Sequence, residues 1–134
     1  MAGGNLPPEV SALIAKHIDS VVRLEVLLHL YRRAPASDTA DGTAKELRVD
    51  AAWASGQLDE LCARGLAECE DGPPKTYRYA PISPQMGAAV DMLAVAFAQR
   101  RVAVIATIYS QPPDPLRTFS DAFKLRKDRG GENG

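Results

Sequence analysis

Residues 43 to 65, TAKELRVDAAWASGQLDELCARG, constrain the fold more than any other stretch of the chain. Thr43 and Glu46 have the spacing of a capping box, in which a hydroxyl and a carboxylate each satisfy a free backbone N–H at the start of a helix. Asp50 is suited to cap a second helix, and Gly65 is suited to end it, because glycine readily adopts the left-handed backbone conformation found there. The stretch therefore predicts two short helices joined by a tight turn.

The second of these helices has one apolar stripe and one polar side. Over residues 51 to 64 the apolar positions recur at the spacing of a helix face turned toward a core. They are Ala54, Leu58, Leu61 and Cys62. The other side carries Trp53, Asp59 and Glu60, and the one basic residue of the helix is Arg64. This composition leaves open whether the outer side contacts nucleic acid or another protein.

Regular elements are predicted on both sides of the helix pair. Residues 8 to 18 and 20 to 33 each place apolar residues along one helical face. Residues 34 to 42 are rich in turn formers and predict a loop. Residues 66 to 70 and 75 to 81 predict the two strands of a β-hairpin, with DGPP at its tip.

The C-terminal third is predicted to be helical. Met86, Val90, Leu93 and Phe97 have helical spacing, and we expect one long helix over residues 84 to 109. Its last part, VAVIATIY at 102 to 109, is β-branched enough that a strand remains an alternative. QPPDP ends this element, and residues 115 to 127 predict a final amphipathic helix.

Length and composition point to one globular domain. The chain has 134 residues, 46% of them hydrophobic, and we expect a single domain over residues 7 to 127 with flexible tails at 1 to 6 and 128 to 134. Two cysteines are too few for a disulfide framework and indicate reduced thiols in the cytoplasm. The N-terminus lacks the pattern of a secretory signal and no apolar run is long enough to span a bilayer, so no membrane partner is expected.

The element order resembles a winged helix-turn-helix domain of the bacterial transcription-regulator type, similar to the MarR and ArsR groups. RLEVLLHLYRR, TAKELRVDAAWASGQLDELCARGLAE and KTYRYAP carry the resemblance, which covers about residues 20 to 81. It implies a mainly α fold with a small β-hairpin wing and extra helices at both ends. It also implies that residues 51 to 64 form the recognition helix.

The same resemblance implies a DNA-binding regulator of transcription that acts as a homodimer on a palindromic site. The helices at 8 to 18 and 84 to 109 would pair two subunits, because they are more apolar than one small domain needs. The residues expected at this dimer interface are Leu13, Val90, Leu93, Phe97 and Ile105.

The predicted DNA-binding part of the chain is acidic, and the C-terminal part is basic. Residues 43 to 81 hold five basic and seven acidic residues, a net charge of −2, whereas residues 99 to 129 carry +4. DNA contact therefore depends on local convergence of cations, since phosphates supply most of the affinity. The expected phosphate contacts are Lys45, Arg48, Lys75 and Arg78. The residues expected nearest the bases are Ser55, Gln57 and Arg64.

Trp53 supports an alternative function. Exposed tryptophan is a favoured anchor at protein interfaces, and here Asp59 and Glu60 accompany it. In this alternative the chain is a winged-helix interaction module that does not bind DNA and docks on a transcription or signalling partner. Trp53 could also pack against the hairpin or the N-terminal helices, and the sequence does not decide between these possibilities.

Catalysis, metal binding and cofactors are not expected. No short stretch places a nucleophile, a base and an orienting group together, and no Gly-rich phosphate loop occurs. Cys62 and Cys69, with His17 or His29, match no strong zinc spacing. A cleft between the head and the long helices would admit a small ligand, but no residue set identifies one.

Overall fold

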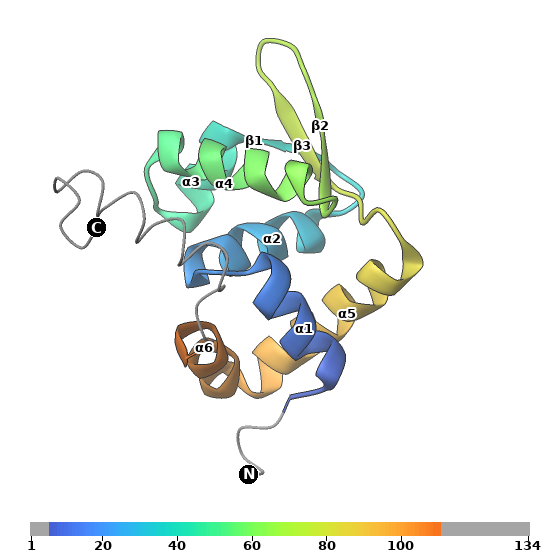
Figure 1. The fold of residues 1–134 in the computed structure, drawn as a ribbon. Coiled ribbons are helices and arrows are strands. Elements are labelled where there is room, and N and C mark those ends of the chain that lie inside the picture. Colours follow the sequence, from blue (N-terminus) through green and yellow to red (C-terminus); the bar gives the residue numbers. More distant parts are fainter. Residues whose placement is uncertain (1–5, 111–134) are drawn as a thin grey trace, which may run out of the picture.

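The computed structural model describes residues 6–110, and within them the chain is mainly helical with one small sheet (Figure 1). Two helices come first, followed by a short strand, two more helices, a hairpin and two final helices. The elements in order are α1 (Pro8–His17), α2 (Val21–Arg33), β1 (Asp38–Thr39), α3 (Ala40–Leu47), α4 (Ala51–Ala63), β2 (Ala67–Glu70), β3 (Thr76–Tyr79), α5 (Pro84–Gln99) and α6 (Arg101–Ser110). No helix in this part of the chain is long and apolar enough to cross a membrane.

The sheet is antiparallel, and β3 lies between β1 and β2. Ala67 pairs with Tyr79 and Glu70 with Thr76, so β2 and β3 form the predicted hairpin, whose tip projects away from the helices (Figure 1). The helix pair α3 and α4 followed by this hairpin is a winged helix-turn-helix, with α1 added before it and α5 and α6 after it. The predicted fold class is confirmed.

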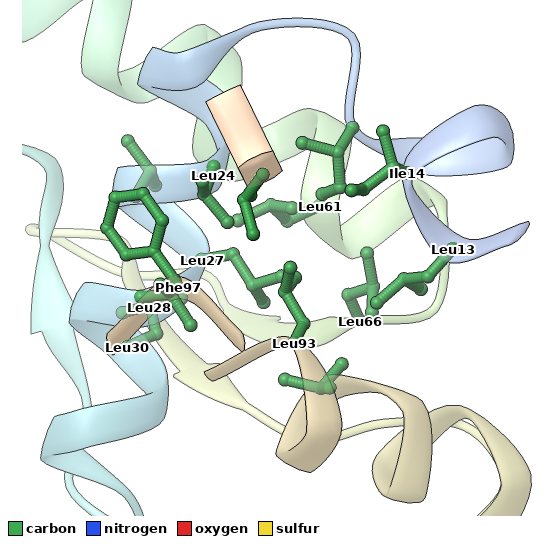
Figure 2. Close-up of a cluster of buried hydrophobic side chains, with 14 of the residues drawn as sticks. Leu13, Ile14, Leu24, Leu27, Leu28, Leu30, Leu61, Leu66, Leu93 and Phe97 are labelled. Carbon is green, nitrogen blue, oxygen red and sulfur yellow. The ribbon is translucent and has the colours of Figure 1, made fainter. Parts of the chain in front are cut away.

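One hydrophobic core joins the helix-turn-helix to the outer helices (Figure 2). Four leucines of α2 lie at its centre and meet side chains from α1, α4, α5 and the start of the hairpin. The labelled members are Leu13, Ile14, Leu24, Leu27, Leu28, Leu30, Leu61, Leu66, Leu93 and Phe97. Because α1 and α5 bury their apolar faces in this shared core, they are packed parts of one folded unit.

A hydroxyl or carboxylate caps the N-terminus of four helices. Ser20, Thr39, Asp50 and Ser83 each accept a hydrogen bond from the backbone N–H three residues later, at distances of 2.9 to 3.1 Å. Such a bond satisfies one of the backbone donors that a helix start leaves unpaired. The predicted cap at Asp50 is confirmed, and Gly65 follows α4 with the expected positive φ of 78°.

The predicted N-cap of α3 is wrong by four residues. Thr39, and not Thr43, caps the helix, and part of the predicted loop over 34 to 42 forms β1 and the first turn of α3. Thr43 is buried inside the helix, where its hydroxyl donates to the carboxylate of Asp38 at 3.3 Å. Only Thr43 has the sequence spacing of a capping box, but the pairing of β1 with β3 holds Asp38 and Thr39 at the start of the helix.

The predicted long helix over 84 to 109 is also corrected. It is interrupted at Arg100, whose backbone leaves the helical region with φ −136° and ψ 54°, and residues 102 to 109 are helical and not a strand. The break turns α6 back alongside α1, where Val104 and Ile108 enter the core (Figure 1). A straight helix would carry these two side chains away from it.

The ends of the predicted domain are only partly described. Leu6, assigned to a flexible tail, packs against the core. The predicted helix over 115 to 127 and the tails at 1 to 5 and 128 to 134 lie outside the described residues.

Candidate nucleic-acid interface

The outer face of α4 is exposed, as a recognition helix requires, but it is small and acidic. Ala54, Leu58 and Leu61 are fully buried, which confirms the predicted stripe, and Cys62 at its edge is half-buried. The exposed positions of α4 are Ala51, Ala52, Trp53, Gly56, Asp59 and Ala63. Trp53 is 50% exposed and is therefore not packed away under the hairpin. None of the exposed positions carries a positive charge.

Two of the predicted phosphate contacts are free cations. Lys45, in the last turn of α3, and Arg48, in the turn before α4, are exposed. Neither forms an ion pair with any residue in the described range 6–110. Both therefore present a full positive charge beside the N-terminal end of α4.

The backbone of Arg48 is in the left-handed region, with φ 61° and ψ 48°. A residue with a side chain is disfavoured there by roughly 1 kcal/mol relative to glycine, because Cβ crowds the following carbonyl. The conformation closes α3 and redirects the chain into α4, with the N–H of Val49 bonded to the carbonyl of Ala44 at 3.0 Å. The turn of the motif thus holds an arginine at a position where glycine would fit better.

The two cations of the hairpin are neutralised by carboxylates. Lys75 Nζ lies 3.0 Å from Asp59 Oδ1, and the Tyr77 hydroxyl donates to the same oxygen at 2.8 Å. The bonds from Tyr77 and Lys75 outweigh the effect of burial and hold the pKa of Asp59 below its usual value. Arg78 pairs with Glu68, the residue directly across the hairpin. The wing therefore offers little net positive charge to a phosphate.

The residues predicted nearest the bases instead contact other side chains of their own chain. Ser55 is half-buried and lies beside the Tyr77 hydroxyl. Gln57 Oε1 accepts from Arg23 Nε at 2.9 Å, and Arg64 pairs with Glu60 at 2.8 Å. These contacts place the three side chains toward their own chain.

Three side chains form a cluster that joins the end of α4 to the end of α1. The cluster is here called the arginine clamp (Arg23, Gln57, Arg64). Arg23 Nη1 donates to the carbonyl of His17 at 3.1 Å, and Arg64 Nη1 donates to that of Lys16 at 2.7 Å. Both carbonyls lie at the C-terminus of α1, where positive charge is favourable. Burial first, and then the nearby charge of Arg64, lowers the pKa of His17.

Asp38, within residues predicted to form a loop, links α2 to the start of α3 in a second network. Its carboxylate lies 2.7 Å from Nε2 of the buried His29 and accepts from the Thr39 N–H at 2.8 Å. The Thr43 hydroxyl and the Arg33 guanidinium also approach it. Burial pushes the pKa of Asp38 upward, but the bonds from His29 and Thr39 and the charge of Arg33 outweigh burial and lower it.

The predicted dimer-interface residues are covered within one chain. Leu13, Val90, Leu93 and Phe97 are buried in the shared core, and Ile105 packs against it. The exposed apolar side chains of α5 and α6 are different ones: Val95, Val102 and Tyr109. Four of the five predicted interface residues are thus buried within their own chain, and the pairing of two subunits through these helices stays a prediction.

An open cleft of about 670 Å³ separates α2 and α3 from α5, where the sequence predicted one. Leu28, Tyr31 and Phe97 contribute apolar surface, and Arg48 is among the basic residues at its edge. The Arg101 guanidinium carbon lies 4.3 Å from the ring centroid of Phe97. No bound group identifies a ligand for this cleft.

The similarity of this chain to known proteins is one of structure and not of sequence. No family model matches the chain, and no curated protein matches it. Among solved structures, the chain is similar to the crystal structure of a mutant MarR from E. coli, with 17% sequence identity and a TM-score of 0.48. The alignment covers 87% of this chain and 86% of that chain.

Proposed function

We propose that this chain is a winged-helix regulator of transcription that binds double-stranded DNA as a homodimer. The proposal is supported by one observation: Lys45 and Arg48, two cations with no ion-pair partner among the described residues, lie beside the exposed face of α4. In a helix-turn-helix the second helix enters the major groove while the preceding turn lies near the backbone, where such cations meet phosphates. Arg64, Lys75 and Arg78 already bond to groups of their own chain. Lys45 and Arg48 would therefore be the principal phosphate contacts.

The affinity for DNA should depend on salt only moderately. Each phosphate contact lowers the slope of log Kobs against log salt by about 0.9. Two free cations per chain give a slope of about −1.8 for one chain and about −3.6 for a dimer on one duplex. This is far from the steep dependence of a strongly basic domain, since Lys75 and Arg78 already have carboxylate partners.

The test is a salt titration of duplex binding with three single-site variants. Lys45→Ala and Arg48→Ala should each weaken binding and make the slope less steep by about 0.9 for each protomer on the duplex. Lys16→Ala, which removes an equal charge at the other end of α4, should leave the slope unchanged. No measurable binding at low salt, or an equal effect of Lys16→Ala, would contradict the proposal.

The variant Arg48→Gly distinguishes an effect of charge on DNA binding from an effect on the stability of the fold. Glycine relieves the left-handed strain, so this variant should unfold with a free energy roughly 0.5–1 kcal/mol higher than the parent chain. It should nevertheless bind DNA as poorly as Arg48→Ala, which keeps the strain. If Arg48→Gly binds as the parent does, the arginine serves the turn alone.

A second candidate function, docking on a protein partner through α4, is favoured by Trp53. Its ring is half exposed, and the small residues Ala52 and Gly56 lie beside it. Small neighbours leave an aromatic side chain accessible to a partner, and such anchors often contribute about 2 kcal/mol or more of binding free energy.

The variant Trp53→Ala tests this candidate. It should abolish capture of a partner from lysate and change the free energy of unfolding by less than about 0.5 kcal/mol, as for other exposed positions. Val102→Ala, an exposed apolar residue on α6, is the matched control and should capture the same proteins as the parent. Unchanged capture by Trp53→Ala would remove the candidate.

A further inference from the structure

Two thiols meet where α4 joins the hairpin. Cys62 lies in the last turn of α4 and Cys69 in β2, and both are free. Only a short connection separates the two elements, with the N–H of Leu66 bonded to the carbonyl of Leu61 at 3.0 Å. The DNA contacts proposed above use neither cysteine.

The strand register places the two cysteines on facing surfaces. Cys69 is directly opposite Tyr77, and residues opposite one another in an antiparallel pair project from the same face. That face is turned toward α4, because the Tyr77 hydroxyl donates to Asp59 at 2.8 Å. Cys62 lies three residues after Asp59 and therefore on the same side of α4. Cys69 is also among the groups that raise the pKa of Cys62, so the two thiols are neighbours.

The two thiols differ in accessibility. Cys69 is exposed to solvent, whereas Cys62 is half-buried. Burial, together with the contact to Cys69, raises the pKa of Cys62 to about 12. Since the thiolate is the reactive form, Cys62 is a poor first nucleophile at neutral pH, and Cys69 is the thiol that an outside reagent reaches.

We propose that Cys62 and Cys69 form an oxidisable dithiol, which a low-molecular-weight disulfide converts into an intramolecular disulfide between α4 and β2. The Cys69 thiolate attacks one sulfur of the reagent, a mixed disulfide forms and one small thiolate leaves. Cys62 then loses its proton and attacks Sγ of Cys69, which releases the second small thiolate. Two protein thiols are oxidised, one reagent disulfide is reduced to two thiols, and the protons pass to the released thiolates and solvent.

The bond would fix the hairpin against the last turn of α4. These two elements contact one another through the shared core and through the bonds of Tyr77 and Lys75 to Asp59, and all of these contacts are non-covalent. A covalent link at Cys69 adds a tether on the same face. The thiol state would thereby set how freely the wing moves relative to the recognition helix.

The experiment uses the full chain and oxidised glutathione. After incubation the protein is denatured, its free thiols are alkylated with N-ethylmaleimide, and the intact mass is measured without reductant. The parent chain should lose two hydrogens and carry neither glutathione nor alkyl group. Cys62→Ser should keep one glutathione on Cys69, because no second thiol displaces it. Cys69→Ser should take no glutathione and should be alkylated at Cys62.

A shifted thiol provides the control for geometry. In the double variant Cys69→Ser with Glu70→Cys, the thiol moves to the next position of β2 and hence to the opposite face of the strand. This variant should accept glutathione without closing the bond. The proposal is overturned if the parent retains glutathione on Cys69, if both its thiols are alkylated, if it links only to a second chain, or if the shifted variant closes equally well.

Discussion

The variant Asp38→Ala is expected to unfold with a free energy about 3 kcal/mol below that of the parent chain. The carboxylate is the hydrogen-bond partner of His29 and Thr43, both of which are buried, and of the Thr39 N–H at the start of α3. A buried polar group that loses its partner costs about 1–3 kcal/mol, and alanine leaves two side chains in that state. Denaturant unfolding at neutral pH measures the loss.

Acid should reduce the difference between Asp38→Ala and the parent. The folded-state pKa of Asp38 is lowered, so its stabilising contribution is present above the unfolded pKa of about 3.9 and is lost as the pH falls through the folded value. Asp71→Ala, at the exposed hairpin tip, is the control and should cost less than about 0.5 kcal/mol. Equal losses for the two variants would show that the Asp38 network does not stabilise the fold.

The variant Leu93→Ala is expected to lower the free energy of unfolding by a similar amount, about 3 kcal/mol, because it leaves a cavity in the core. Leu93 is fully buried among side chains of its own chain (Figure 2). The loss should therefore be the same at low and high protein concentration. A side chain buried only between two subunits would instead give a loss that depends on concentration.

Val95→Ala is the matched variant for Leu93→Ala, two residues along α5. Val95 is 56% exposed, so the substitution should hardly change the stability of a single chain. If α5 pairs two chains through its exposed side, Val95→Ala should instead lower the dimer fraction in solution. A loss at Leu93 that grows on dilution would restore this residue to the subunit interface.

Much of the architecture could be predicted from local patterns. The apolar spacing of α2, α4 and α5, the Asp50 cap and the turn residues around DGPP each depend on neighbours within one or two turns of chain. Local patterns do not mark the break at Arg100, because neither proline nor glycine lies there and the apolar spacing continues across it. The break follows from packing of α6 on α1, which is a tertiary effect.

The candidate interface was harder to predict than the fold. Sequence identifies Lys75 and Asp59 as charges of opposite sign, but they lie 16 residues apart and only the folded hairpin brings them together. Likewise Arg23 reads as a solvated helix residue until the ends of α1 and α4 meet around it. Long-range pairing therefore decided which cations stay free, and Lys45 and Arg48 are free because no carboxylate of the described chain approaches them.

The arginine clamp has a mechanical consequence. The last carbonyls of α1 bond to one arginine from α2 and to one from α4. The C-terminal ends of α1 and α4 are thereby linked by side-chain hydrogen bonds that do not involve the hairpin. A displacement of α1 would therefore be passed directly to the C-terminal end of α4.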